Sequence, residues 1–150
     1  MIISAFPCCG KSFYAKEHKD ALDLESSAFS WMESHGTKIR NPDFPNNYMD
    51  TLLSVQNIYA YIFVSSHSSV RVALKNSKLD YTLIYPENTP ECYQEWKRRC
   101  YERGTKNLWD TLLSSCWSNL IHSCQQDNHA KKHLILRPEM YIEDVLGQVS

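Results

Sequence analysis

The sequence predicts an α/β sandwich with a mainly parallel sheet, because segments typical of strands alternate with segments typical of helices along the chain. The clearest strand is Tyr59–Val64, which is apolar, aromatic and β-branched and is therefore typical of a strand buried on both faces. A length of 150 residues fits one domain, residues 1–150. In sheets of this kind ligands bind at the carboxyl ends of the strands, so a site is expected in the segments that follow them.

The same alternation gives the order of the elements. Strands are expected at Met1–Phe6, Ala21–Leu24, Tyr59–Val64, Tyr81–Tyr85 and His133–Leu136. Helices are expected at Lys11–Lys19, Tyr48–Gln56, Ser68–Asn76, Pro90–Glu102, Asn107–Cys124 and Tyr141–Leu146. Pro42 and Pro45 place a loop at Asn41–Asn47, because each proline disfavours helical geometry in the residue before it.

Composition excludes several classes of protein. The chain has 16 basic and 17 acidic residues, and this balance argues against a strongly basic nucleic-acid binder. A hydrophobic content of 43% argues against disorder. The longest apolar run, Ile58–Val64, is too short for a membrane span, and no signal peptide is expected, since the first residues, MIISAF, lack its charged start and long apolar stretch. Without a signal peptide or a CxxC pair, the six cysteines are expected to be reduced thiols.

The strongest motif comes directly after the first strand, where Ala5–Ser12 reads AFPCCGKS. This is the phosphate-binding loop pattern GxxxxGK[ST], with Ala5 at the first glycine position. Such loops aim successive backbone N–H groups and the positive end of the next helix at phosphate oxygens. Lys11 is expected to reach the β- and γ-phosphates of ATP, and the Ser12 hydroxyl to bind Mg²⁺. The predicted phosphate-binding residues are Pro7, Cys8, Cys9, Gly10, Lys11, Ser12 and Phe13.

The two loop cysteines have two interpretations. A helix N-terminus and a neighbouring lysine lower the pKa of a thiol, so Cys8 and Cys9 are candidates for redox sensitivity. Alternatively, they are small side chains that fit a tight loop. The sequence leaves both interpretations open.

Polar residues also follow the second and third strands. Asp23 is predicted to be catalytic and, with Ser12, to bind Mg²⁺. The predicted acceptor-binding residues are Asp23, Glu25, Ser26, Ser27, Phe29, Ser66, His67 and Arg71. For Asp23 and the serines, and for Ser66 and His67, capping of the next helix is the alternative.

A basic segment runs from Glu95 to Gly104 and reads EWKRRCYERG. Arg98, Arg99 and Arg103 are predicted to be catalytic, on a helical lid of about residues 87–106 that covers the charge of a transferring phosphoryl group. A solvated, charged helix face is the alternative.

Six segments carry a resemblance to a known family: IISAFPCCGKSF, LDLESSAFSW, YIFVSSHSSVRVAL, YTLIYPE, EWKRRCYERG and HLILRPEMYIEDVL. Together they resemble compact P-loop kinases of the nucleoside-monophosphate-kinase type, especially small phage-encoded nucleotide kinases. The resemblance implies a three-layer fold like that of P-loop NTP hydrolases, with a five-stranded parallel sheet of order 2-3-1-4-5. It implies ATP on the Pro7–Ser12 loop, an acceptor near Asp23–Phe29 and arginines on the lid.

The expected activity is transfer of the γ-phosphoryl group of ATP to a deoxynucleoside monophosphate or to a nucleobase hydroxyl, with ATP and Mg²⁺ as cofactors. The first alternative is a kinase acting on 5-hydroxymethyluracil in DNA, as in some phage members, with Lys97–Lys106 as the basic patch. The second is a P-loop nucleotide-binding module that transfers nothing. A cytoplasmic protein is expected, in the host cytoplasm if phage-encoded, with no membrane contact.

Overall fold

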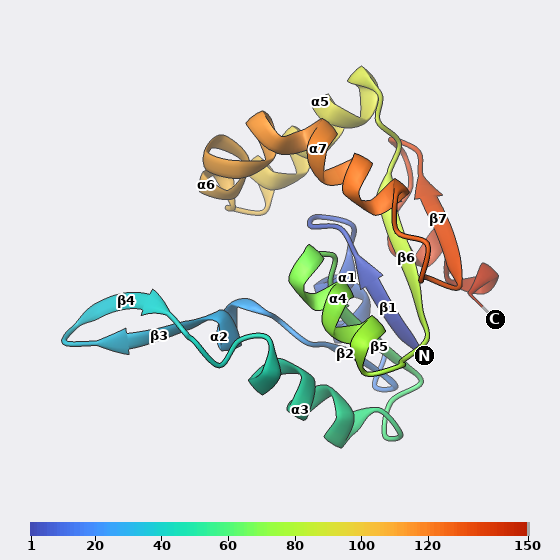
Figure 1. Ribbon diagram of the computed structural model, residues 1–150. Coiled ribbons are helices and arrows are strands. Elements are labelled where there is room, and N and C mark those ends of the chain that lie inside the picture. Colours follow the sequence, from blue (N-terminus) through green and yellow to red (C-terminus); the bar gives the residue numbers. More distant parts are fainter. Residues whose placement is uncertain (150) are drawn as a thin grey trace.

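A parallel sheet of five strands forms the centre of the molecule, with helices on both sides (Figure 1). The computed structural model describes residues 1–149. The sheet strands are β1 (Ile2–Ala5), β2 (Ala21–Asp23), β5 (Tyr61–Ser65), β6 (Tyr81–Pro86) and β7 (Lys132–Leu136). They lie in the order β2-β5-β1-β6-β7, and every pairing between them is parallel. The predicted α/β class with a parallel sheet of five strands is confirmed.

The numbering of this order differs from the predicted 2-3-1-4-5, because the chain contains a two-stranded antiparallel hairpin that the sequence did not predict. The hairpin strands are β3 (Trp31–Ser34) and β4 (Thr37–Arg40), and they come between β2 and β5 in the chain. Within the sheet alone, the strands from one edge to the other are the second, third, first, fourth and fifth in chain order. The hairpin projects away from the sheet as an arm (Figure 1).

The helices follow the predicted order: α4 and α5 have the predicted bounds, the other predicted helices have shifted ends, and α2 was not predicted. They are α1 (Lys11–Glu17), α2 (Ser27–Ser30), α3 (Asn46–Val55), α4 (Ser68–Asn76), α5 (Pro90–Glu102), α6 (Lys106–Leu108) and α7 (Ser114–Gln125). A π-helical segment, Trp109–Leu113, joins α6 to α7, so the predicted helix at 107–124 is nearly continuous. The predicted closing helix at 141–146 is wrong, because that segment forms short 3₁₀ turns, Ile142–Asp144 and Leu146–Gln148.

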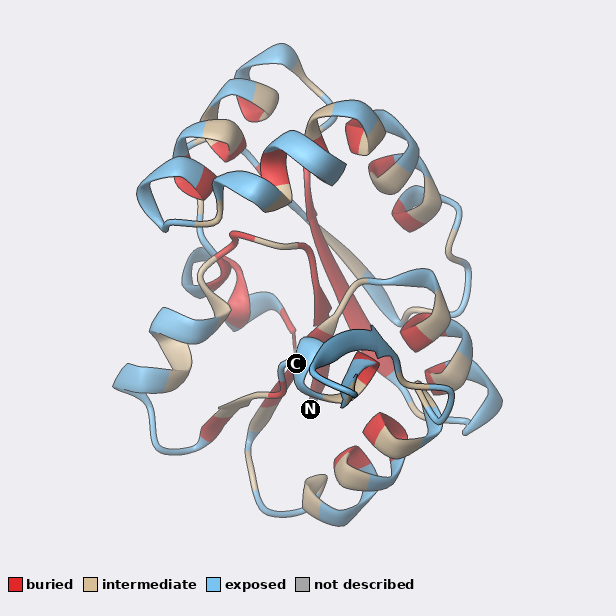
Figure 2. Ribbon diagram, turned by 90° about the vertical axis from the view of Figure 1, so that its left-hand side faces the viewer, coloured by how far each residue is buried: buried red, intermediate tan, exposed pale blue. Residues whose placement is uncertain are grey.

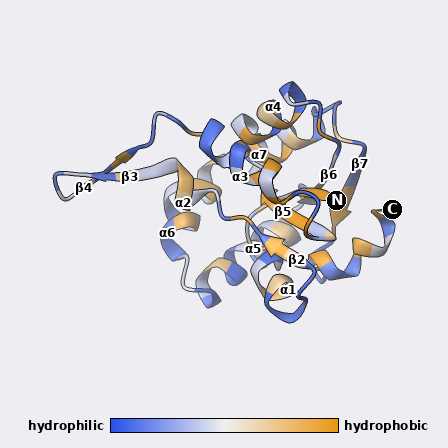
Figure 3. Cartoon of the chain, turned by 90° about the horizontal axis from the view of Figure 1, so that it is seen from below, coloured by the Kyte–Doolittle hydropathy of each residue, from blue (hydrophilic) through white to orange (hydrophobic). Residues whose placement is uncertain are grey.

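Both faces of the sheet are covered, as the apolar strands require. On β5, Ile62 and Val64 pack into a cluster with α3 and α4, whereas Phe63 between them packs on the opposite face with Tyr14 of α1. Figure 2 shows the buried strands in red between helices with exposed outer faces. The same strands carry strongly hydrophobic residues in Figure 3. Across residues 1–149, no helix is long and apolar enough to cross a membrane.

An aromatic cluster packs α5 against α7. The ring centre of Trp117 lies 6.1 Å from that of Trp96 on α5 and 6.0 Å from that of Trp109. The same ring meets Phe6 edge to face at 5.6 Å, directly after β1. Trp96 is fully buried, so α5 belongs to the core of the protein.

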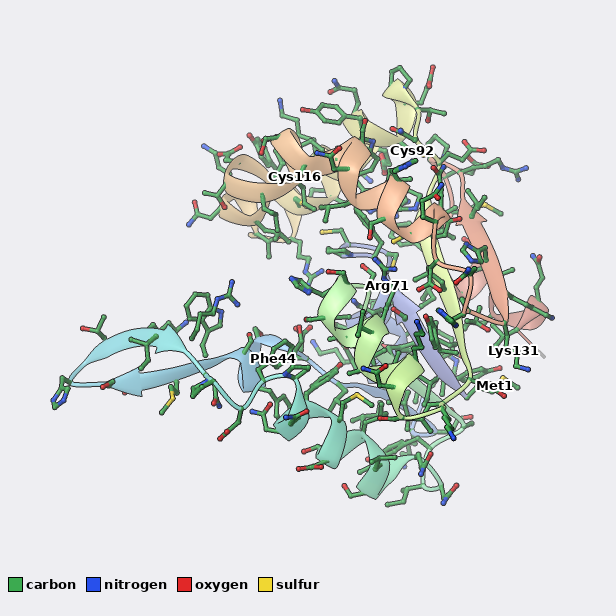
Figure 4. The ribbon with its side chains drawn as sticks, in the orientation of Figure 1. Met1, Phe44, Arg71, Cys92, Cys116 and Lys131 are labelled. Carbon is green, nitrogen blue, oxygen red and sulfur yellow. The ribbon has the colours of Figure 1, made fainter. Side chains whose placement is uncertain are left out.

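A buried ion pair connects α4 to the end of α7. The guanidinium of Arg71 lies 3.0 Å from the carboxylate of Asp127, and both side chains are almost completely buried. Arg71 also donates to the Ser66 carbonyl and to Ser123 of α7, and Tyr81 donates to Asp127 at 2.7 Å. Figure 4 shows Arg71 extending from α4. Its guanidinium is therefore bonded within the fold, and acceptor binding by Arg71 stays a prediction.

Replacement of Asp127 by asparagine is expected to remove a pH-dependent part of the stability. Burial raises the pKa of Asp127, but hydrogen bonds from Tyr81, from two backbone N–H groups and from Arg71 outweigh it and hold the pKa at about 2. The ordinary value is 3.8, so ionised Asp127 stabilises the fold by about 2 kcal/mol above pH 4, and this is lost as the pH falls towards 2.

Urea unfolding of wild type and Asp127→Asn at pH 7, 4 and 2 tests this. The difference in the free energy of unfolding is expected to be largest at pH 7 and to shrink towards pH 2. A difference that stays constant over this range contradicts the role given to the carboxylate.

Candidate functional site

The Phe6–Gly10 loop joins β1 to α1 at the carboxyl edge of the sheet. Its backbone turns through two residues with positive φ, Cys8 at 61° and Gly10 at 98°. A Cβ on Gly10 would lie 3.2 Å from Cδ1 of Tyr141, and the positive φ would strain any other residue there. The motif glycine is therefore at a position that requires it.

Three carbonyl groups of this loop are held by the surrounding protein. Pro7 accepts a hydrogen bond from the Trp96 indole at 2.9 Å, Cys8 from Arg99 at 3.3 Å, and Cys9 from the backbone N–H of Ile142 at 2.8 Å. The N–H groups of the same peptide units belong to residues 8, 9 and 10. Cys9 closes the turn at residues 7 and 8, whereas none of the loop and turn hydrogen bonds of residues 1–149 has the N–H of residue 8 or 10 as its donor, so these two N–H groups are available to an anion.

A cavity of about 400 Å³ opens beside the loop. It is lined by Cys8, Gly10, Lys11, Ser12, Phe13, Lys16, Arg99, Glu102, Arg103 and Tyr141. Four of these side chains are cationic and one is acidic, a balance suited to a polyanion. A second cavity, of about 320 Å³, lies between α3 and α4 and holds no comparable group of charges.

Lys11 is the first residue of α1 and is half-buried. Its ammonium group donates to the carbonyl of Ala5 at 3.0 Å, so the side chain folds back over the loop that it follows. A phosphate oxygen beside the loop would compete with this single carbonyl for the ammonium group. Phe13, in contrast, is 66% exposed and meets the cavity only as part of its lining.

Ser12, in the first turn of α1, and Asp23, the last residue of β2, are brought together. The Ser12 hydroxyl donates to Oδ2 of Asp23 at 2.6 Å, across the carboxyl ends of β1 and β2. A hydroxyl and a carboxylate are hard oxygen donors of the kind that Mg²⁺ accepts, with water and phosphate oxygens completing its coordination. Within residues 1–149 no group of three or more His, Cys, Asp or Glu side chains is placed to hold a metal ion. The residues present therefore fit a magnesium ion shared with a phosphate ligand, and not a closed protein site.

The two loop cysteines differ. The Cys8 sulfur lies 3.0 Å from the Cys100 sulfur on α5. The hydrogen bond from Cys100 lowers the pKa of Cys8 to about 6. Burial acts against this shift, and the charge of Arg103 adds to it. The Cys9 thiol donates to the Phe6 carbonyl, and burial raises its pKa to about 11. Thiolate character is confined to Cys8, whereas Cys9 acts as a small buried side chain.

The three predicted lid arginines do not share a face. Arg98 points outward, where its guanidinium pairs with Glu95 and Glu102 and remains 49% exposed. Arg103 is exposed, lines the cavity and points Nη1 at the Cys8 sulfur at 3.8 Å. Arg98 therefore matches the alternative of a solvated, charged helix face. Of Arg98 and Arg103, only Arg103 lies in a position suited to a phosphate group.

Arg99 is 5% exposed and is fixed in place. Its guanidinium stacks 3.8 Å from the Tyr141 ring centre and donates to three carbonyl groups, those of Cys8, Pro138 and Met140. Because α5 is anchored by this residue and by its buried aromatic face, the helix forms a wall of the cavity, and a lid at 87–106 stays a prediction.

The predicted acceptor residues lie at the same edge of the sheet with different surroundings. Glu25 and Ser27 are exposed, and Ser26 precedes α2 and accepts its first backbone hydrogen bonds. Phe29 packs edge to face against the ring of Tyr48 at 5.3 Å, so it belongs to the core between α2 and α3.

After β5, the capping alternative describes the structure. The imidazole of His67 accepts from the backbone N–H of Ser69 and caps α4, and its pKa is lowered by burial and by the charges of Arg40 and Arg71. The Ser66 carbonyl accepts from Arg71.

Two groups of residues near the site were missed by sequence reasoning. Tyr141 forms part of the cavity wall; its position after the last strand was the available signal. At the base of the hairpin, the guanidinium of Arg40 lies 4.2 Å from the ring centre of Trp31, and the charge of Arg40 reaches His67. A turn-forming His35-Gly36 between two polar strands was the only sequence signal for this arm.

Comparison with known proteins does not assign this chain to a family. The chain matches no protein-family model, and no curated protein matches it.

Proposed function

We propose that this chain is an ATP-dependent phosphotransferase that moves the γ-phosphoryl group to a nucleotide, either a deoxynucleoside monophosphate or a nucleobase hydroxyl. The observation that supports it best is the convergence at one cavity of the loop, Lys11 and Ser12, whose hydroxyl is hydrogen-bonded to the Asp23 carboxylate. The resemblance to nucleoside-monophosphate kinases points the same way.

In this proposal the residues at the cavity bind the phosphates of ATP, hold them in position and neutralise their negative charge. The loop N–H groups and Lys11 bind phosphate oxygens, and Lys11 leaves the Ala5 carbonyl to do so. Ser12 and Asp23 would hold Mg²⁺, which would neutralise charge on the phosphates. Of the other cations that line the cavity, Lys16, Arg99 and Arg103, we assign Arg103 to supply positive charge where negative charge spreads over the transferring group.

Asp23→Asn is expected to lower turnover roughly 100-fold and to raise the Mg²⁺ concentration needed for half-maximal rate, because an amide is a weaker magnesium ligand than a carboxylate. The fold is expected to survive, since the Asp23 side chain is only half-buried. Steady-state kinetics over a Mg²⁺ titration measures both effects.

Asp20→Asn is the matched control for this variant, because Asp20 is exposed in the turn that leads into β2. It is expected to behave like wild type. Equal Mg²⁺ dependence for Asp23→Asn and wild type argues against Asp23 as a metal ligand.

The acceptor is tested with γ-labelled ATP against the nucleoside monophosphates and against hydroxymethylated DNA, with Lys11→Ala as the blank. Label transfer to a monophosphate supports the first activity. Hydrolysis without transfer to any acceptor, or nucleotide binding alone, favours the non-catalytic module.

One observation favours the DNA-directed alternative. On the outer side of α5 and α6, the ammonium groups of Lys97 and Lys106 each lie 5.7 Å from the ring centre of Tyr101. This basic and aromatic patch is suited to a phosphate backbone. Binding to a short DNA that weakens steeply with salt, and that is lost in Lys97→Ala/Lys106→Ala, supports this alternative; salt-insensitive or absent binding leaves the free nucleotide as the acceptor.

A further inference from the structure

The loop beside the cavity carries a second chemically active feature, a pair of thiols. Cys8 of the loop and Cys100 of α5 are 92 residues apart in the chain, and their sulfur atoms lie 3.0 Å apart. Both cysteines are buried, but Cys8 also lines the cavity, through which a small reagent reaches its sulfur. A disulfide bond is about 2.05 Å long, so the two atoms need to approach by only about 1 Å to bond.

We propose that Cys8 and Cys100 form a thiol-oxidation site that a peroxide converts to a disulfide, covalently tying the Phe6–Gly10 loop to helix α5. This goes beyond the proposed phosphotransferase and stands whether or not the chain transfers phosphate. The ligand class is a small hydroperoxide, such as hydrogen peroxide.

The surroundings assign different roles to the two sulfurs. The guanidinium of Arg103 lies 3.8 Å from the Cys8 sulfur, and the Cys100 thiol donates to it; both stabilise a thiolate at Cys8. The pKa of Cys100 is raised by its hydrogen bond to Cys8 and by burial, so Cys100 keeps its proton. Cys8 is therefore the sulfur that meets the peroxide, and Cys100 resolves the product.

The reaction proceeds in two balanced steps. The Cys8 thiolate attacks one peroxide oxygen and the O–O bond breaks, giving a sulfenic acid at Cys8 and a hydroxide that takes up a proton to become water. The Cys100 sulfur, giving up its proton, then attacks the Cys8 sulfur and displaces the second oxygen as water. Two thiols and one hydrogen peroxide become one disulfide and two waters.

The neighbouring Cys9 provides an internal control. It follows Cys8 directly, but its thiol is fully buried, donates to the Phe6 carbonyl and has a pKa raised to about 11. Cys9 is therefore expected to stay reduced under conditions that oxidise Cys8.

The experiment treats the wild-type protein with one equivalent of hydrogen peroxide at pH 7 and then blocks the remaining thiols under denaturing conditions. The number of blocked thiols is expected to fall from the six cysteines of the sequence by two, with the mass of the unblocked chain lower by two hydrogens. Dithiothreitol restores the original state. Trypsin, which cuts after Lys11, Arg99 and Arg103, is expected to release peptide 1–11 joined to peptide 100–103. Fragmentation assigns the bond to Cys8 and not to Cys9.

Three variants complete the test. Cys8→Ser and Cys100→Ser are expected to lose the disulfide, whereas Cys9→Ser keeps it; circular dichroism checks that each variant is folded. If Cys100→Ser does not fold, the peptide map of the wild type still decides the result. A bond through Cys9, over-oxidation of Cys8 without a disulfide, or unchanged thiols after peroxide overturns the proposal.

Discussion

Lys11→Ala is expected to lower ATP-dependent transfer at least about 100-fold while leaving the fold intact. Lys11 is the cation closest in sequence to the unpaired loop N–H groups, and removal of one such charge at a transferring group has effects of this size. The bond to the Ala5 carbonyl is the one hydrogen bond that the Lys11 ammonium makes within residues 1–149, so the melting temperature is expected to change little when it is removed. Steady-state turnover and a thermal melt measure the two quantities.

Lys75→Ala is the control for this variant, because Lys75 is exposed on α4 and does not line the cavity. It is expected to match wild type in both measurements. Undiminished turnover in Lys11→Ala means that the Ala5–Ser12 segment does not bind the reacting phosphate, and the proposed function then fails.

Arg99→Ala is expected to destabilise the protein by about 3 kcal/mol, which for a domain of this size is a fall of roughly 10 °C in melting temperature. The substitution leaves the carbonyl groups of Cys8, Pro138 and Met140 without their donor. It also removes the guanidinium that packs against the rings of Trp96 and Tyr141, whose centres lie 4.0 Å and 3.8 Å from the guanidinium carbon. Urea unfolding of the two proteins measures the loss.

The adjacent position supplies the comparison. Arg98→Ala removes an arginine from the same helix, but its charge is solvated and paired only with neighbouring glutamates, so the melting temperature is expected to stay close to that of wild type. Arg99→Lys keeps the charge without the flat, forked guanidinium and is expected to recover only part of the stability. Equal melting temperatures for Arg98→Ala and Arg99→Ala contradict the anchoring role of Arg99.

The parts of the fold that the sequence predicted are those with a strong local pattern. The sheet strands are short apolar runs with a turn or a proline after them, and such runs identify buried strands without knowledge of their partners. The hairpin lacks this pattern, because Trp31–Ser34 and Thr37–Arg40 have almost no buried residues and so no periodicity. Strands that are exposed to solvent on both faces have no periodic spacing of hydrophobic residues by which the sequence could predict them.

Some residues of the candidate site could likewise be predicted from local sequence, and others could not. Ser12 and Asp23 were predictable as neighbours, because Ser12 follows one strand, Asp23 lies at the end of another, and parallel strands end at one edge of a sheet. The role of Arg99 was not, because two of its carbonyl partners lie 39 and 41 residues further along the chain. Within EWKRRCYERG, nothing local distinguishes the buried arginine from the exposed one beside it. Only the packing of α5 through Trp96 decides which of the two turns inward.

The hydrogen bond from Trp96 to the Pro7 carbonyl also has a spectroscopic consequence. The chain has four tryptophans, and three of them form the cluster of Trp96, Trp109 and Trp117, with Trp96 bonded to the loop at 2.9 Å. The fourth, Trp31, stands apart on the hairpin and is removable as Trp31→Phe. In that variant all indole emission comes from the core beside the loop. Any ligand that shifts Pro7 changes the polarity around the Trp96 N–H, so the intrinsic fluorescence of the unlabelled protein reports on the state of its loop.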